Sequence, residues 1–376
     1  MSTGTLTPAP APAHRDGPAP GAHTPWGHAL RTAVLAAIAV CIVLLAFAWP
    51  GVTAKVQNLP VAAVGTPEQV AQVASKAPGG ALDVRRAASR DEAVELIRTK
   101  EAYGAVILGN APEVFIASAA SPAAAQFLTQ VGQQMQSQIQ AQVIARPQDA
   151  LGQAAQHAAQ GSAPAAPQSP APQQAPQAAT PTVTVTDVVP LSPDDPRGAG
   201  LAVAGLPLAM GGMIGGVLIS LLVSGTWRRL GAIAAYGVLA GLGLAGILQG
   251  WFHILQGSFW ANAGAIGLGV VATAAIIVGL NALLGRAGIA LGAVITLFVG
   301  NPLSSLTQPK EFLPAPWGDV GQWLVPGASG TLLRDLSYFP EASALFPWLV
   351  LVGWAVVGAV LIAVGHFRNE PAVAEV

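Results

Sequence analysis

Three acidic residues near the middle of the chain, Asp187, Asp194 and Asp195, are of a type that could ligate a hard cation. Their spacing does not match a cation-binding loop, and no His or Cys lies beside them. The sequence therefore favours a solvated joint in which Arg197 pairs with a neighbouring carboxylate. We expect Asp194, Asp195 and Arg197 to form this joint, and we expect no bound metal ion.

Motifs for catalysis are missing from the rest of the chain. None of the four lysines ends a G-x-x-x-x-G-K phosphate-binding loop, and the six histidines form no H-E-x-x-H motif. The stretch Gly327–Gly330 (GASG) has the wrong spacing for a nucleophile elbow. We therefore expect no catalytic residue, no cofactor-binding residue and no enzyme activity in this chain.

The scarcity of charged side chains indicates a membrane environment. Of the 376 residues, 52% are hydrophobic and only 9% are charged, whereas soluble domains carry about 25% charged residues. No Asp, Glu, Lys or Arg occurs between Arg229 and Arg286. The lipid bilayer is thus the expected partner. A net charge of −1 gives no basic patch for nucleic acid, and the single cysteine, Cys41, excludes an internal disulfide.

Apolar stretches long enough to cross a bilayer predict an α-helical polytopic membrane protein with six transmembrane helices. The fifth stretch contains Asn301-Pro302 and could break there. The predicted spans are Thr32–Trp49, Leu201–Val223, Leu230–Gly250, Ala263–Leu284, Ala287–Leu306 and Phe346–Val364.

The positive-inside rule places both termini in the cytoplasm. With this orientation, the short outside loops hold only Lys310 and Arg334. The first span has a second interpretation, because Ala46-Phe47-Ala48 resembles a signal-peptidase site. The long Pro-rich leader favours a retained anchor. The inside segments hold Arg15, Arg31, Arg228, Arg229, Arg286 and Arg368.

A small extracellular α/β domain is predicted between the first and second spans, at residues 51–145. Short apolar runs predict strands at Pro60–Gly65, Leu82–Ala87, Tyr103–Leu108 and Val114–Ala119. Between them, helices are predicted at Pro67–Ala77 and, capped by Ser89, at Asp91–Glu101. A return strand is predicted at Val183–Val189 (VTVTDVV), within the joint at 183–200.

A longer helix is predicted from Ser121-Pro122 to about Val143, with an apolar stripe that must pack on something. The small domain, a second copy of the chain and a ligand are the candidates, and packing is favoured. Residues 146–182 are rich in Pro, Ala and Gln and predict a disordered linker, as do the Pro/Ala-rich residues at the N-terminus. The stripe consists of Leu128, Val131, Met135, Ile139 and Val143.

Glycine pairs four residues apart predict close helix–helix contacts in the membrane. The doubled pair in the second span is the best candidate, although the sequence does not decide whether one copy or two are involved. The pairs are Gly211/Gly215, Gly212/Gly216, Gly237/Gly241, Gly246/Gly250 and Gly288/Gly292.

The order of these parts resembles the membrane subunit of ABC-type exporters of the type-two permease superfamily. It is closest to the phage-infection-protein-like branch with a large extracellular domain, which is abundant in actinobacteria. The stretches that carry the resemblance are LPVAAVG (Leu59–Gly65), DEAVELIRTKEAYGAVILG (Asp91–Gly109), ASAASPAAAQFL (Ala117–Leu128), VTDVVPLSPDDPRGAG (Val185–Gly200), NPLSSLTQPKEFLPAPWG (Asn301–Gly318) and GQWLVPGASGTLLRDLSYF (Gly321–Phe339).

The resemblance implies a permease subunit without an ATPase site of its own, working with a cytoplasmic ATP-binding cassette protein as a homodimer or as a heterodimer with a related permease. The turn at Trp227, Arg228 and Arg229 would contact that ATPase. The charge-free spans suit an apolar or amphipathic cargo moved outward. The alternative is a non-transporting membrane scaffold or surface receptor that acts through the extracellular domain.

These expectations divide the chain into seven parts. They are a cytoplasmic tail (1–28), the first helix (29–50), the α/β domain (51–145), the linker (146–182), the return strand and joint (183–200), a five-helix membrane domain with an extracellular segment at 306–345 (201–366), and a second cytoplasmic tail (367–376).

Overall fold

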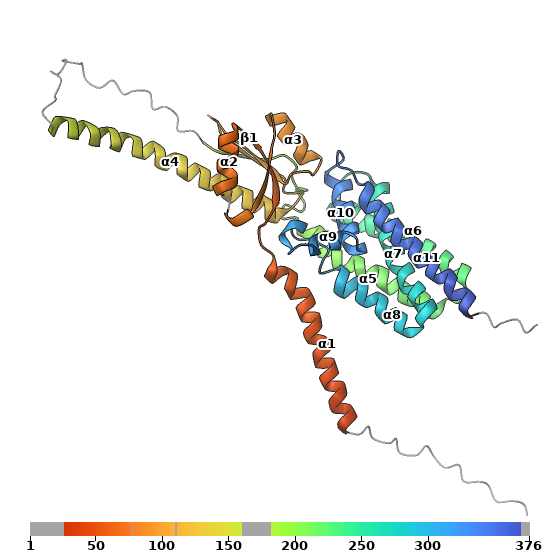
Figure 1. Cartoon of the computed structure of the whole chain (residues 1–376). Coiled ribbons are helices and arrows are strands. Elements are labelled where there is room, and N and C mark those ends of the chain that lie inside the picture. The colour runs from red at the N-terminus through yellow and green to blue at the C-terminus, as the bar shows by residue number, and fades with distance from the viewer. Residues whose placement is uncertain (1–25, 77, 110, 160–181, 370–376) are drawn as a thin grey trace, which may run out of the picture. The chain divides into compact units, whose positions relative to one another are not determined.

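A computed structural model describes residues 26–76, 78–109, 111–159 and 182–369 (Figure 1). The chain divides into two compact units between Leu45 and Ala46. The first helix, α1 (Trp26–Thr53), crosses this division and contains the predicted first span. Because α1 begins at Trp26, the predicted tail at 1–28 is too long by three residues; the rest of that tail lies outside the described residues.

Five helices among the described residues are long and apolar enough to cross a membrane. Besides α1, they are α5 (Ala199–Leu222), α6 (Thr226–Ala245) with its π-helical continuation η2 (Gly246–Trp251), α7 (Phe259–Leu284) and α11 (Leu345–Asn369). The chain is therefore a mostly helical, multi-pass membrane protein.

The predicted count of six spans is not confirmed. The fifth predicted span forms α8 (Arg286–Ala293) and the π-helix η3 (Val294–Gly300), which end just before Asn301-Pro302. At 1.5 Å per residue this apolar segment is about 22 Å long, short of the roughly 30 Å hydrocarbon core. The proline ends the helix because it cannot donate a backbone hydrogen bond.

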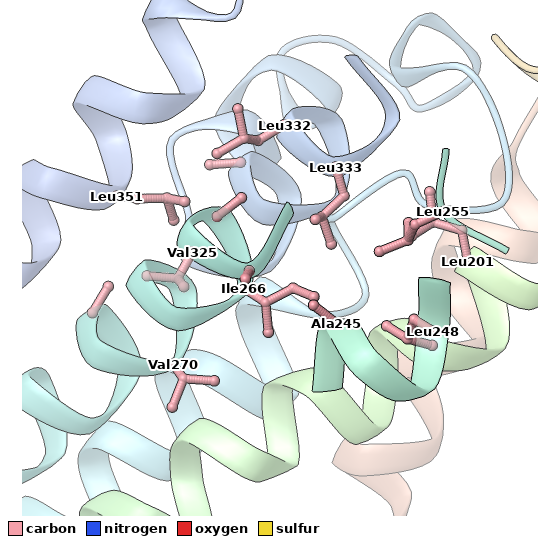
Figure 2. Packing of buried hydrophobic residues seen from close by; sticks show 14 of the residues in the cluster. Leu201, Ala245, Leu248, Leu255, Ile266, Val270, Val325, Leu332, Leu333 and Leu351 are labelled. Atoms are coloured by element: carbon pink, nitrogen blue, oxygen red, sulfur yellow. The ribbon is translucent and has the colours of Figure 1, made fainter. Parts of the chain in front are cut away.

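Helix α7 lies at the centre of the helical bundle. It contacts α5, α6, α8, α11 and also α10 (Val325–Tyr338), and more than half of its residues are buried. Its sequence is uncharged and rich in Gly and Ala, so that other helices can approach it on all sides. Figure 2 shows part of the resulting core, where Ile266 and Val270 of α7 lie among side chains of neighbouring elements, including Val325 and Leu351.

The glycines of α5 make contacts within one chain. A Cβ atom on Gly212 would lie 2.6 Å from the Cβ of Thr273 on α7, and one on Gly216 would lie 3.0 Å from the Cα of Ala274. Neither contact leaves room for a larger side chain. The doubled glycine pair of the second predicted span is thus used to pack α5 against α7.

Tyr236 of α6 packs against Gly211 and Gly215 of α5. Its hydroxyl donates a 2.7 Å hydrogen bond to the Gly211 carbonyl, and its ring lies where a Cβ on Gly215 would be, 2.0 Å from Cε1. On α6 itself, Gly237 and Gly241 approach α7 in the same way, at Val271 and at the Ala263 carbonyl. The question left open by the sequence is answered for these three pairs, because all of them pack helices of the same chain.

The sheet domain (Leu59–Asp187) is present and has the predicted element order. Its strands are β1 (Leu59–Val64), β2 (Leu82–Arg86), β3 (Gly104–Ile107), β4 (Glu113–Ile116) and β5 (Thr184–Asp187). They form one sheet in the order β2-β1-β3-β4-β5, parallel except for the antiparallel pair β3–β4.

The helices of the sheet domain follow the predicted strands. Helix α2 (Pro67–Lys76) connects β1 to β2 through the short η1 (Pro78–Gly80), and α3 (Arg90–Arg98) connects β2 to β3. The predicted cap is confirmed, since the Ser89 hydroxyl accepts a 3.1 Å hydrogen bond from the Glu92 amide.

Helix α4 (Pro122–Ala159) is longer than predicted. Its stripe begins on the sheet, where Leu128 is fully buried and Met135 packs beside it, and ends at Val143, which is 39% exposed. The helix continues through residues 146–159, which were expected to be disordered (Figure 1). These residues are mostly Ala and Gln, which are good helix formers. The remainder of the predicted linker, 160–181, lies outside the described residues.

Candidate functional site

The segment between Asn301 and Ala344, here called the docking segment, packs against the sheet domain. It contains η4 (Lys310–Phe312), α9 (Trp317–Gln322) and α10. Phe312 joins the core on the α4 face of the sheet, with Val61 of β1, whereas Phe339 joins the core on the α3 face, with Ala62. The docking segment therefore places one aromatic ring on each face of the same strand, since consecutive side chains of a strand point to opposite faces.

A buried ion pair lies beside Phe339. The ammonium group of Lys100, which follows α3, contacts the carboxylate of Asp335 on α10. Their side chains are 20% and 5% exposed. Burial lowers the pKa of Lys100 and raises that of Asp335, and in each case the partner's charge opposes the effect. Either group left alone in this position would be costly, so the pair couples the sheet domain to α10.

Lys100 occupies a position that normally favours glycine. Its φ of 63° is left-handed, and its amide donates to Ile97 while the Glu101 amide donates to Leu96. This arrangement is a Schellman motif, in which glycine is the usual residue after the helix. A lysine there costs about 1 kcal/mol of backbone energy. Because the backbone would favour glycine, the lysine is explained by what its side chain contacts.

A second polar contact joins Tyr103 of the sheet domain to Glu311 of η4. The Tyr103 hydroxyl donates a 3.1 Å hydrogen bond to a carboxylate oxygen of Glu311. Burial raises the pKa of Tyr103 well above its usual range, and the neighbouring negative charge of Glu311 adds to this effect. The phenol is thus held in its neutral, donating form.

Arg334, next to Asp335 on α10, is a cation whose hydrogen-bond acceptor is a backbone carbonyl. One of its guanidinium nitrogens donates a 2.9 Å hydrogen bond to the Leu306 carbonyl. Among the described residues, no carboxylate lies within 4.0 Å of its guanidinium nitrogens. The side chain is partly buried, and burial lowers its pKa. Arg334 therefore carries a positive charge with unused donors in a poorly solvated place.

These residues line an open cavity of about 560 Å³ between the sheet domain and the docking segment. Its size is within the range of about 300–1,000 Å³ that is usual for small-molecule sites. Most of the residues that line it are polar or charged, while Trp323 and Phe346 form an aromatic part of the wall, their rings in edge-to-face contact at 5.0 Å. An amphipathic molecule would find both kinds of surface in this cavity.

A much smaller apolar void of about 30 Å³ lies inside the bundle, between α5, α7 and α10. Leu306 lines this void, and its side chain fills a slot between Gly205 and Gly330, where added Cβ atoms would lie 2.2 and 1.9 Å from its methyl carbons. The adjacent Ser305 lines the larger cavity and has a left-handed φ of 53°. Two consecutive residues, Ser305 and Leu306, thus line the polar cavity and the apolar void respectively.

The turn predicted to contact an ATPase is only partly available. Trp227 is 84% exposed and Arg228 is exposed. The guanidinium of Arg229, however, donates to the carbonyls of Val223 at 2.9 Å and Ser220 at 3.4 Å. It thus satisfies the carbonyl groups at the end of α5, where a cation is also favoured by the helix dipole. The residues available to a partner are Trp227 and Arg228.

The predicted acidic joint forms, but its charges are used differently than expected. The Asp195 carboxylate accepts hydrogen bonds from the amides of Ala199, at 3.0 Å, and Gly200, at 2.8 Å, and so caps the start of α5. Asp187 accepts from Ser118 instead. The expected pairing of Arg197 with a neighbouring carboxylate is wrong for the described residues, since no ion pair there involves Arg197. Free amides at a helix N-terminus attract the carboxylate more directly.

Sequence reasoning missed the residues around the cavity. Lys100, Tyr103 and Arg334 belong to no local motif, and Lys100 and Asp335 are 235 positions apart. One signal was present, because a cluster of charged residues lies between two stretches, 287–309 and 342–367, that contain no Asp, Glu, Lys or Arg. The cluster consists of Lys310, Glu311, Asp319, Arg334, Asp335 and Glu341. Such a cluster next to apolar helices indicates a polar site at the end of a membrane domain.

The fold defines a multi-pass helical membrane protein with a five-stranded sheet domain docked on its helical part. No family model matches the chain, and no curated protein or solved structure is significantly similar to it.

Proposed function

We propose that this protein is the membrane-spanning permease subunit of an ABC-type exporter, which moves an apolar or amphipathic cargo outward across the bacterial cell membrane. The cavity of about 560 Å³ carries this proposal, because it lies where the sheet domain meets the bundle and combines polar and aromatic walls. Neighbouring residues line it and the apolar void, since Ser305 lines the cavity and Leu306 lines the void. The resemblance of the sequence to such permeases supports the same reading.

In this proposal both termini are cytoplasmic and the sheet domain is extracellular. This arrangement needs an even number of crossings, so α8 and η3 together must form the sixth, with the bilayer locally thinned around this short segment. The energy comes from a separate ATP-binding cassette protein, which contacts Trp227 and Arg228, and two permease subunits act together. The described spans contribute no charged side chain to the bundle core, so ion coupling through intramembrane carboxylates has no support here.

The test is affinity purification of the full chain from its host in mild detergent, followed by ATPase assays. We expect a stoichiometric ATP-binding cassette protein whose hydrolysis depends on this subunit. Arg228→Glu with Trp227→Ala should release that partner. Arg229→Glu is unsuitable because it would also remove the α5 cap, and Arg286→Glu in the next loop on the same side serves as the control. Recovery of envelope proteins without any ATPase would contradict the exporter.

A membrane scaffold or surface receptor is the second candidate, favoured by the far end of α4. Beyond the sheet, the apolar side chain of Val143 on this helix is 39% exposed. The Val183 amide donates to the Gln136 side chain at 2.6 Å, so the chain leaves and returns at nearly the same place. Residues 139–181 can therefore be replaced by a short Gly/Ser linker without disturbing the sheet. A receptor that uses α4 should lose its function in this variant, whereas an exporter should retain cargo flux.

A further inference from the structure

We propose that the cavity between the sheet domain and the docking segment binds an anionic amphiphile, with Arg334 holding a phosphate or carboxylate head group and Trp323 and Phe346 contacting the apolar chain. This inference deepens the proposed function by naming the class of cargo. Only the statement that the bound molecule is a cargo rests on the proposed function. The binding itself requires no ATPase.

The first step is the charge distribution along the cavity wall. Three of its four cations already have carboxylate partners: Arg85 lies 3.7 Å from both Asp83 and Glu101, Lys310 lies 2.7 Å from Asp319, and Lys100 contacts Asp335. Arg334 is the one cavity-lining cation of the described chain that has no carboxylate within 4.0 Å.

The second step is the cost of that charge. The guanidinium of Arg334 is partly buried and makes no direct contact with a carboxylate of the described residues. Burial lowers the pKa of Arg334, and the charge of Asp335, which is more than 4.0 Å away, opposes this effect without reversing it. Its planar fork has five N–H donors, of which one contact, to the Leu306 carbonyl, is made within the described residues. An oxyanion in the cavity would supply both the missing charge and bidentate acceptors.

The third step is the aromatic part of the wall. Trp323 is 63% exposed and Phe346 is 43% exposed. The Trp323 carbonyl is held by the indole N–H of Trp354 at 2.7 Å, which fixes this corner to α11, and α11 begins at Leu345. The aromatic rings thus lie where a membrane helix starts, so an acyl chain could pass over them toward the bilayer. A free inorganic anion would make no use of this surface.

The experiment uses the full-length chain, purified in a neutral maltoside detergent without phosphate, and isothermal titration calorimetry. The probes are dihexanoyl phosphatidate, dihexanoyl phosphatidylcholine as the zwitterionic match, and inorganic phosphate as the head group alone. We expect phosphatidate to bind at least tenfold more tightly than either control. Equal binding of phosphatidate and phosphatidylcholine would overturn the anionic head group, and equal binding of inorganic phosphate would overturn the amphiphile.

Variants locate the site. Arg334→Gln keeps an N–H donor for the Leu306 carbonyl but removes the charge and the fork, so its phosphatidate affinity should fall by about 10- to 100-fold. Arg334→Lys retains the charge without the fork and should lose less. Arg85→Gln, on the same wall but already paired, should stay within about twofold.

Trp323→Ala tests the aromatic part of the cavity wall and does not change the residues around Arg334. It should weaken phosphatidate binding several-fold while leaving inorganic phosphate unchanged. Folded Arg334→Gln with wild-type affinity would overturn the proposal. If that variant does not fold, wild-type affinity in both Arg334→Lys and Trp323→Ala would overturn it equally. Loss of the ATPase partner in the earlier purification would leave these results standing, so the two failures are distinguishable.

Discussion

Neutralising Asp335 should loosen the sheet domain from the docking segment. Asp335→Asn leaves Lys100 without a counter-charge in a site where the lysine side chain is 20% exposed. Removing one partner of a fully buried pair costs about 3–5 kcal/mol. Because some water reaches Lys100, we expect the lower end, about 3 kcal/mol. This value is somewhat below the roughly 4 kcal/mol between two unit charges about 4 Å apart at an effective dielectric constant of about 20.

Hydrogen exchange of the full chain in detergent measures this change. The Lys55 amide donates a 3.0 Å hydrogen bond to the Phe312 carbonyl, so it exchanges when the docking segment separates. A loss of about 3 kcal/mol corresponds to roughly 100- to 200-fold faster exchange. The double variant Lys100→Met/Asp335→Asn should recover most of the protection, because no unpaired charge remains.

The exposed pair between Lys310 and Asp319 provides the matched control, since its side chains are 43% and 72% exposed. Asp319→Asn should change exchange by less than about fivefold, as exposed pairs contribute roughly 0–1 kcal/mol. If Asp335→Asn behaved like Asp319→Asn, or if the double variant exchanged as fast as Asp335→Asn, the reasoning about the buried pair would be refuted.

Three further changes can be compared by thermal unfolding in one detergent. Gly215→Val should destabilise the protein by about 1–3 kcal/mol or prevent folding, because its Cβ would meet the Tyr236 ring at 2.0 Å. The control Gly231→Ala, with open space around it, should be neutral or stabilising. A larger loss of stability in Gly231→Ala than in Gly215→Val would contradict the intrachain packing. Arg229→Gln should cost about 1–2 kcal/mol even without any partner protein, and unchanged stability would argue against its capping role. Asp195→Ala should cost about 1 kcal/mol through loss of the α5 cap, and a smaller effect than a surface substitution such as Asp91→Ala would exclude that role.

Local patterns were sufficient to predict most elements. The apolar runs predicted α1, α5, α7 and α11, and the strands of the sheet domain were predicted in their observed order. The Ser89 cap was predicted because a serine lies directly before the predicted helix, and it is confirmed. These predictions succeed because burial in lipid, strand alternation and helix capping depend on residues that are close together in the sequence.

Errors occurred where two local signals compete. Asn301-Pro302 ends the fifth apolar run early, which leaves a segment shorter than a bilayer and the count of six spans unconfirmed. The Ala/Gln-rich residues after Arg146 contain both proline and strong helix formers, and through Ala159 the helix formers decide the structure. For the joint at 183–200, the sequence suggested that Arg197 would pair with a neighbouring carboxylate. In the structure, the Asp195 carboxylate instead accepts hydrogen bonds from free amides at the start of α5.

By itself, the sequence determined that this chain is a multi-pass membrane protein with a small α/β domain, because length, hydropathy and periodicity are properties of contiguous residues. Only the tertiary structure decided that the glycine pairs of α5 and α6 pack helices within one chain, and that Lys100 contacts Asp335 across 235 positions. It also decided that Arg334 lines a cavity with no carboxylate of the described residues within 4.0 Å of its guanidinium nitrogens. Such pairings depend on how separate elements pack, and no local pattern in the sequence records them.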